Sequence, residues 1–303
     1  MAETKQSLAT KNVVEVIGKV IENNLKVEKD YVNGSLTVKY GDMADQVVEA
    51  SVYVAAKKGE NKDEPNPKYD KMKDLHSTLT TVAQATEENP TSIVRISGRE
   101  PFTPQIELNE YASSGEVISN PQVSLGFGNI KIVDIKPEDF KATYEMVVFL
   151  TANPKMVEDR LKVDAVYINY KGEIKPLSFF VEDEDLIEGI EGCEKGQTIE
   201  IWGDVKIANV VETKEKKSGF GGKAKTDTTI TTTRELIITG GNPIDDTDKR
   251  AINADDVKKG FVEREAFLEE LKKDKADNKK KEGGTFAGNG SKSASKKTSD
   301  IPF

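Results

Sequence analysis

Lysines surround a single phenylalanine in the segment 214–225, which has the sequence KEKKSGFGGKAK. Ammonium groups follow a phosphate backbone and an exposed aromatic ring stacks on bases, so this composition is typical of a surface that binds single-stranded nucleic acid. Nearby glycines allow close approach of the backbone. The alternative is a solvated hairpin loop. The Gly-Phe-Gly-Gly-Lys piece at 219–223 lacks the spacing and the Ser or Thr of a P-loop, so nucleotide binding is not expected there. The candidate contact residues are Lys214, Lys216, Lys217, Phe220, Lys223 and Lys225.

Trp202 is a second candidate for base stacking. Apolar residues at positions 199, 201, 205 and 207 alternate with other residues, so a strand that buries them turns Trp202 and Lys206 outward. The alternative is that the indole packs against a neighbouring domain or a C-terminal helix. Weaker candidates lie on polar strand faces or in a Gly/Pro-rich turn, and an ordinary surface position is favoured for each: Lys39, Tyr53, Arg95, Arg99 and Phe102.

The chain offers little for catalysis. Hydrolases and zinc enzymes recruit histidine as a base or ligand, but this chain has one histidine, His76, and one cysteine, Cys193, far apart in sequence. The adjacent carboxylates at positions 183–185 diverge and lack the spacing of a calcium loop. We therefore expect no enzymatic activity, no cofactor and no metal site. The single cysteine also predicts a reducing compartment.

Two stretches of short strands must position the candidate residues. Over residues 12–135, alternating apolar residues predict strands near 13–21, 35–40, 48–54, 93–97, 105–108, 116–119 and 129–133. A polar loop is predicted at 57–67. A helix is predicted over 68–87, with an apolar stripe made of Met72, Leu75, Leu79, Val82 and Ala83.

The pattern repeats over residues 138–242. Strands are predicted near 140–151, 161–168, 177–181, 199–207 and 228–239, with a short acidic turn or helix at 182–196. Five strands and a helix are the content of an OB-fold, a Greek-key barrel that binds oligonucleotides, although a small β-sandwich has a similar pattern. We predict a mostly β (α+β) fold with a flexible N-terminus (1–11) and two OB-fold-like β-barrel domains, at 12–135 and 138–242.

The character of the chain changes after Asn242. We predict a helix over 255–281 and a disordered linker, rich in Gly, Ser and Lys, over 283–299. The chain then ends on an apolar tip. Such a tip, with its terminal carboxylate, can dock in a small apolar pocket that is rimmed by Arg or Lys, although four residues are few enough for a chance ending. The tip consists of Asp300, Ile301, Pro302 and Phe303.

Asp-Ile-Pro-Phe at the end of a low-complexity linker, after an OB-like body, resembles bacterial and phage single-stranded DNA-binding proteins. The resemblance implies a protein that coats ssDNA in DNA replication, recombination and repair and recruits partner proteins through residues 300–303. Two features depart from the family. Asp300 is the one acid at the tip and Lys292, Lys296 and Lys297 precede it, which predicts weaker partner binding. Two barrels in one chain, where many members have one and form tetramers, favour a monomer or dimer and a phage origin.

The net charge of −9 does not favour a generic polyanion binder, so the distribution of charge matters more than its sum. Residues 1–11 have no apolar signal region, and no apolar run approaches the roughly 18–20 residues of a membrane helix. We therefore expect a cytoplasmic protein, in the bacterial host if it is phage-encoded. Two other functions stay open: an interaction adaptor of a replisome or recombination complex without tight DNA binding, and a phage structural protein.

Overall fold

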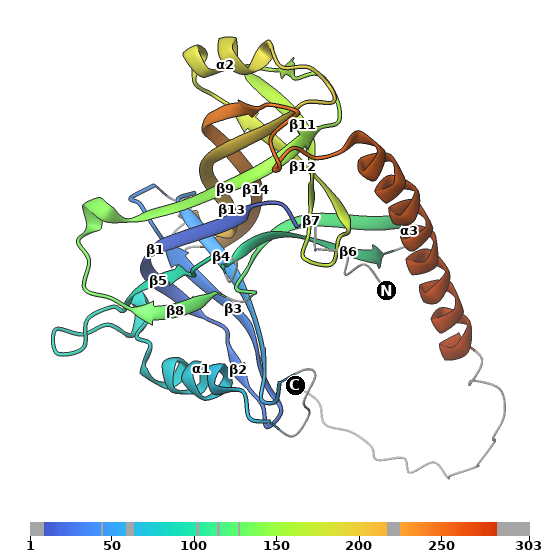
Figure 1. Ribbon diagram of the computed structural model, residues 1–303. Helices are drawn as coiled ribbons and strands as arrows, with labels where there is room; N and C mark the ends of the chain where they lie inside the picture. The colour runs from blue at the N-terminus through green and yellow to red at the C-terminus, as the bar shows by residue number, and fades with distance from the viewer. Residues whose placement is uncertain are drawn as a thin grey trace, which may run out of the picture.

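The computed structural model describes residues 9–43, 45–58, 64–100, 103–113, 116–126, 128–216 and 225–283, with side chains undescribed over 208–232 and from 274 onward. The fold is mostly β, with an OB-like barrel, extra strands and three α-helices, as the sequence predicts (Figure 1). None of the described helices combines the length and apolarity that crossing a membrane requires.

Five of the N-terminal strands follow one another in a circuit, and a sixth, β5, pairs with the first of them. β1 pairs with β3, β3 with β4, β4 in parallel with β7, and β7 with β6, while β5 precedes β6 in the chain and pairs with β1. The elements are β1 (Asn12–Asn23), β2 (Lys26–Val27), β3 (Tyr31–Lys39), β4 (Val47–Ala55), α1 (Pro67–Thr78), η1 (Val82–Gln84), β5 (Ile93–Ser97), β6 (Gln105–Ser113), β7 (Glu116–Ser124), β8 (Asn129–Ile132) and η2 (Pro137–Asp139).

Asn12 completes this circuit where the chain between β5 and β6 leaves the sheet. Its buried side chain donates to the carbonyl of Ile106 at 2.8 Å and accepts from the Ile106 N–H at 3.0 Å. The amide therefore replaces the backbone pair that a continuous strand would form, and it satisfies two buried polar groups of β6.

A second circuit follows with the same strand order. β9 pairs with β11, β11 with β12, β12 in parallel with β14, β14 with β13, and β13 with β9. Each circuit has the five-stranded content of an OB-fold. The elements are β9 (Lys141–Leu150), β10 (Lys155–Val157), β11 (Arg160–Ile168), β12 (Ile174–Val181), α2 (Glu184–Glu191), β13 (Thr198–Lys216), β14 (Lys225–Ile244) and α3 (Ala254–Gly283).

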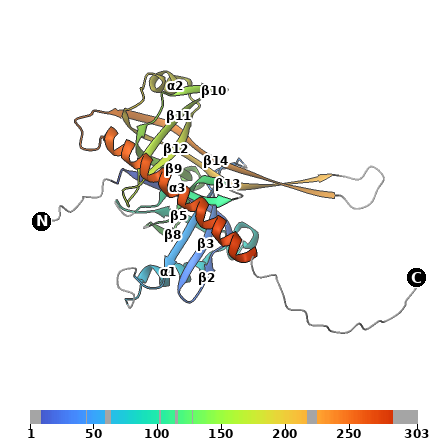
Figure 2. The same cartoon turned by 90° about the vertical axis from the view of Figure 1, so that its right-hand side faces the viewer.

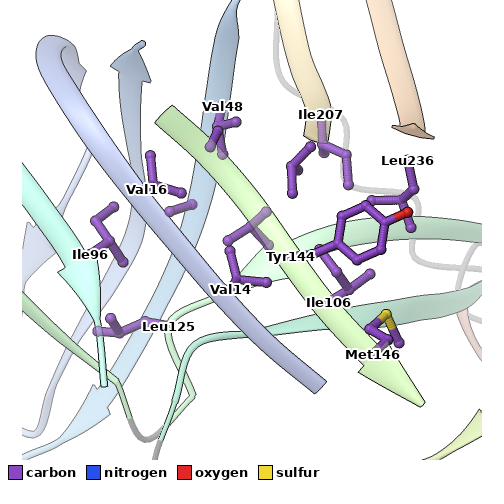
Figure 3. Packing of buried hydrophobic residues seen from close by; sticks show 14 of the residues in the cluster. Val14, Val16, Val48, Ile96, Ile106, Leu125, Tyr144, Met146, Ile207 and Leu236 are labelled. Carbon is purple, nitrogen blue, oxygen red and sulfur yellow. The ribbon is translucent and has the colours of Figure 1, made fainter. Parts of the chain in front are cut away.

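The first strands of the two circuits pair with each other. β1 and β9 run antiparallel from Asn12 opposite Met146 to Ile17 opposite Lys141. One buried hydrophobic cluster extends through both circuits, from Val14 and Ile96 to Ile207 and Leu236 (Figure 3). The halves therefore share a core, and the predicted domain limits at 135 and 138 stay a prediction.

The predicted helix over 68–87 is wrong in its second half. α1 ends at Thr78, and Leu79 already has an extended backbone, with φ −69° and ψ 128°. Thr80 and Thr81 then take up hydrogen bonds that oppose a continuing helix: the Thr80 N–H donates to Ser92 Oγ, and the Thr81 N–H donates to Gln84 Oε1. Val82 and Ala83, placed on the apolar stripe by the sequence, are exposed instead.

α3 docks against strands of both circuits, beside β12 of the second and β6 and β7 of the first (Figures 1 and 2). Gly260 permits close packing, because a Cβ there would lie 2.4 Å from Ile174 Cγ1. Arg264 donates to Glu110, which is 3 % exposed, and Lys175 Nζ donates to the same carboxylate at 3.1 Å. A buried carboxylate between two cations therefore fastens the C-terminal helix to strands of both circuits.

Candidate nucleic-acid interface

OB-folds bind oligonucleotides on the face of their second and third strands and with the loops that join strands 1–2 and 4–5. In the first circuit these strands are β3 and β4. Tyr31 and Tyr53 project from their outer face, with ring centroids 5.9 Å apart and an interplanar angle of 26°. Tyr53 is 67 % exposed. A stacked tyrosine pair with one open ring face provides a platform for a nucleobase.

A cation lies in the same cross-strand row as Tyr53. Lys26 of β2 pairs with Asn33, and Asn33 pairs with Tyr53, so the three side chains share one face of the sheet. Lys26 is exposed, and β2 belongs to the connection between the first two barrel strands. The backbones of Lys26 and Tyr53 are therefore two strand spacings, about 10 Å, apart. The stacking platform and an ammonium group for a phosphate share one face of the sheet.

A cavity of about 330 Å³ opens on this face, beyond the tyrosines, where the base of the β13–β14 ribbon approaches. Gly34 has a φ of +126°, and a Cβ there would lie 2.2 Å from the Asn24 carbonyl oxygen, so β3 requires glycine at this point. The cavity is lined by Gly34, Ser35, Glu49, Ser51, Gln122, Ile207 and Arg234.

The corresponding face of the second circuit, on β11 and β12, is occupied by internal contacts. The Arg160 guanidinium lies 4.3 Å from the centroid of the Phe180 ring. Arg160 also donates to both carboxylate oxygens of Glu235, each at 3.1 Å, and these bonds are the main cause of its raised pKa. Because Arg160 stacks on the Phe180 ring and is itself held by Glu235, this face does not offer an open ring on which a base could stack.

Beside this face lies a groove of about 500 Å³ between β11–β12, the β6–β7 hairpin and α3. Asp164 accepts hydrogen bonds here from Ser178 Oγ at 2.6 Å and Lys162 Nζ at 3.2 Å, and although burial opposes it, these partners keep the pKa of Asp164 below its ordinary value. Phe261 of α3 and Phe180 of β12 both line the groove, together with Arg234.

The predicted lysine-rich segment lies at the end of a long antiparallel ribbon. β13 and β14 extend well beyond the sequence-predicted strands, and the ribbon projects from the body of the protein (Figure 2). In its last pairs, Lys214 lies opposite Asp227 and Lys216 opposite Lys225. Lys217, Phe220 and Lys223 fall outside the described residues. The ribbon joins strands 4 and 5 of the second circuit, one of the loop positions that OB-folds use for binding.

Trp202 is 38 % exposed and alternates with buried neighbours, so its outward direction agrees with the sequence pattern. It lies between Glu145 of β9 and Gly240 of β14, and a Cβ at Gly240 would be 2.4 Å from the indole Nε1. Lys206 Nζ is 3.9 Å from Glu182. The indole therefore rests on a glycine of β14, on the face formed by β9 and β13 and apart from the tyrosine pair.

The weaker candidates do not gather around Tyr53. Lys39 lies at the far end of β3 and donates to the Asp42 carbonyl at 3.1 Å. Arg95 of β5 donates to Glu15 at 2.7 Å, next to Lys141, which also pairs with Glu15. Arg99 is exposed in the turn after β5, and Phe102 falls outside the described residues. The tip at 300–303 also falls outside them.

Sequence reasoning missed Tyr31, Lys26, Arg234 and the two groove phenylalanines. Tyr31 precedes the strand predicted at 35–40, but the alternation of Tyr31, Asn33 and Ser35 with Val32 could have extended that strand to include it. Phe180 and Phe261 look like core residues in sequence. No local pattern brings them together, because β12 and α3 meet only in the folded chain.

The chain is similar to known proteins in two comparisons, and no curated protein matches it. A family model described as YorF matches residues 11–274. The wild-type single-stranded DNA binding protein from Thermus aquaticus is 12 % identical over 78 % of this chain and 94 % of that one, with a TM-score of 0.46. A deletion mutant of the same protein is 13 % identical over 80 % of this chain and 98 % of that one, with a TM-score of 0.46. The mitochondrial single-stranded DNA binding protein Rim1 from S. cerevisiae is 14 % identical over 37 % of this chain and 97 % of that one, with a TM-score of 0.23.

Proposed function

The chain belongs to the YorF family, and we propose that it binds single-stranded DNA without catalysing a reaction on it. The observation that carries this proposal is the stacked Tyr31–Tyr53 pair on the outer face of β3 and β4. Tyr53 is 67 % exposed, and a base that covers its ring would remove this apolar surface from water. Oligonucleotides are among the ligands that OB-folds bind at this position.

Binding combines stacking with phosphate contacts. Each base stacked on an aromatic ring contributes roughly 1–3 kcal/mol, independently of base identity. Lys26 supplies an ammonium group beside the platform, and the ribbon lysines Lys214, Lys216, Lys217, Lys223 and Lys225, with Phe220, supply a second contact region. Lys39, Arg95, Arg99, Phe102 and Lys206 are additional candidate contacts, whereas Trp202 lies on the face of β9 and β13, apart from the tyrosine pair, and is not expected to contact the strand.

The cellular role follows from the same chemistry. The protein would coat ssDNA, melt its hairpins and protect it from nucleases during DNA replication, recombination and repair. The tip, Asp300 to Phe303, would recruit partner proteins. We place the protein in the bacterial cytoplasm as a phage product, acting as a monomer or dimer through two OB-like domains at 12–135 and 138–242.

A titration with fluorescently labelled dT oligomers of about 30 nucleotides, at low and moderate salt, tests the proposal. We expect saturable binding that weakens with salt, since each phosphate contact on a single strand contributes about −0.7 to the slope of log K against log salt. A duplex of equal length is the control and should bind more weakly. Tight binding with no salt dependence would contradict the phosphate contacts.

The net charge of −9 favours a second candidate, an interaction adaptor that uses the tip and does not bind DNA tightly. Charge reversal of Lys214, Lys216 and Lys217 separates the two functions. A loss of ssDNA affinity in the charge-reversed variant supports the DNA-binding protein, whereas no effect on ssDNA affinity favours the adaptor.

A further inference from the structure

Arg234 lies where the two binding faces meet. It belongs to β14 and lines both the cavity on the β3–β4 face and the groove beside β11–β12. One of its nitrogens, Nη1, lies 3.4 Å from the Pro121 carbonyl oxygen in the middle of β7, and the guanidinium is partly exposed. A single arginine therefore lines two hollows of about 330 and 500 Å³, each of which is bordered by strands of both circuits.

Aromatic rings lie at both ends of the two hollows. Tyr31 and Tyr53 are not part of the lining of the first hollow, but they form an exposed stack on the same face of β3 and β4. In the second groove Phe180, backed by Arg160, faces the space that Phe261 of α3 also borders. Phe261 is 37 % exposed, although its helix is docked by the buried pairs of Glu110.

We infer that the two hollows form one continuous track for a single DNA strand, in which Arg234 binds the phosphate at the crossing and α3 forms the outer wall of the second half. This inference rests on the proposed function and extends it to a second site. The guanidinium presents five N–H donors in a fixed fork, which matches a phosphate that passes between the hollows. Phe261 supplies a second ring for a base.

The arrangement fits a nucleic acid better than a peptide. Aromatic rings at both ends and an arginine between them follow the repeat of base and phosphate along a strand. The carboxylate in the second groove, Asp164, is paired with Lys162 at 2.9 Å, so it repels a passing phosphate less than a free carboxylate would. In the first cavity a carboxylate, Glu49, and a guanidinium, Arg234, both belong to the lining, so the cavity contains one charged group of each sign.

The length dependence of binding tests this inference. One OB-fold covers about 4–16 nucleotides, so a dT oligomer of about 8 nucleotides fits the tyrosine face alone and one of about 30 fills the whole track. We expect Arg234→Gln and Phe261→Ala each to weaken the long oligomer about fivefold and to change the short one less than about twofold. Tyr53→Ala should weaken both oligomers. These ratios correspond to about 1 kcal/mol for the lost contact.

Val262→Ala is the matched control, because it removes side-chain atoms from the neighbouring, well-exposed position of α3 that does not line the groove, and it should leave both affinities unchanged. Circular dichroism checks that each variant folds. If Arg234→Gln does not fold, Phe261→Ala still tests the inference, because Phe261 is partly exposed and its replacement should be tolerated. Equal effects on both lengths, or no effect on the long oligomer, overturn the single track while leaving the tyrosine face as the site. Failure of the wild type to bind either oligomer rejects the proposed function itself.

Discussion

The two circuits repeat one strand order but treat the same face in opposite ways. On β3–β4 the aromatic side chains are stacked on each other and open to solvent. On β11–β12 the corresponding aromatic, Phe180, is covered by Arg160, and Arg160 is held by Glu235 of β14. A helix that follows the second circuit then borders the remaining space through Phe261.

Strand order decides which face of a barrel carries these aromatic side chains, but it does not decide whether they are open to solvent. The first face offers its rings directly, so a base can stack without displacing a protein contact. The second face has its charges paired internally and offers a groove instead of a platform. Binding in this groove, as proposed above, would depend on α3, which in turn is held by the buried carboxylate of Glu110.

The largest effect is expected from Glu110→Gln, which removes the charge that holds α3. Glu110 is 3 % exposed and accepts from both Lys175 and Arg264, so its loss leaves two largely buried cations without their main partner. We expect the free energy of unfolding to fall by about 3 kcal/mol, the typical cost of breaking a buried ion pair. Urea unfolding measures this change.

Glu173→Gln is the matched control for this prediction. Glu173 contacts the same Lys175 at 3.3 Å, but its side chain is 50 % exposed, so its removal should cost less than about 1 kcal/mol. Glu110→Gln should also weaken long ssDNA more than short ssDNA if α3 walls the second groove. Similar stability losses for the two variants would show that Glu110 does not hold the helix.

Tyr53→Ala should have the next largest effect, and it acts on the open face. Removing the exposed ring eliminates a stacking contact worth roughly 1–3 kcal/mol, so ssDNA affinity should fall about tenfold with little change in stability. Tyr170→Ala is the control, since it removes an exposed tyrosine from the turn between β11 and β12. If both variants bind as tightly as wild type, the β3–β4 face is not the platform.

Much of this comparison could be predicted from the sequence. The alternation of apolar and polar residues correctly predicted β5 at 93–97 and the outward direction of Tyr53 and Trp202. This worked because successive side chains of a strand point to opposite faces, so a strand with one solvated face has a period of two. The number of strands and the position of a helix were typical of an OB-fold, although a small β-sandwich has a similar pattern. The end of α1 was missed, because the buried hydrogen bonds of Thr80 are tertiary contacts that no helical period contains.

The residues of the site that come together only in the folded chain could not be predicted from the sequence in this way. Arg234 lies in a Thr-rich strand and Phe261 on a charged helix, and neither has neighbours in sequence that mark a function. Their importance arises from the parallel pairing of β12 with β14 and from the docking of α3 on β12. Both are long-range contacts, and local patterns carry little information about them.

A smaller effect is expected from pH, and it belongs to the first circuit alone. Lys68 of α1 donates to the Gly126 carbonyl at 2.8 Å, and burial lowers the pKa of its ammonium from 10.5 to about 8. Between pH 8 and 10.5 the unfolded chain binds a proton that the folded chain has released, so the free energy of unfolding should rise with pH there. The rise should stay below about 1 kcal/mol, because the amine is partly solvated.

Lys68→Met isolates this contribution. Below pH 8 both states of the wild type hold the proton, so the difference in unfolding free energy between wild type and variant should be constant there and change only above it. Urea unfolding at several pH values between 7 and 10 gives the difference. A constant difference over the whole range would show that Lys68 keeps an ordinary pKa in the folded chain.

The smallest effect is expected from Trp202→Phe. The indole rests on Gly240 on the β9–β13 face, away from the tyrosine pair and from both hollows, so a strand that follows the proposed track does not contact it. Affinity for a labelled dT oligomer of about 30 nucleotides should change less than about twofold, well under the effect of losing one stacked base. In the wild type, Trp202 fluorescence should respond weakly to saturating DNA. A tenfold loss of affinity, or strong quenching of Trp202, would instead move the strand onto β9–β13 and make the second circuit, not the first, the one with the open aromatic platform.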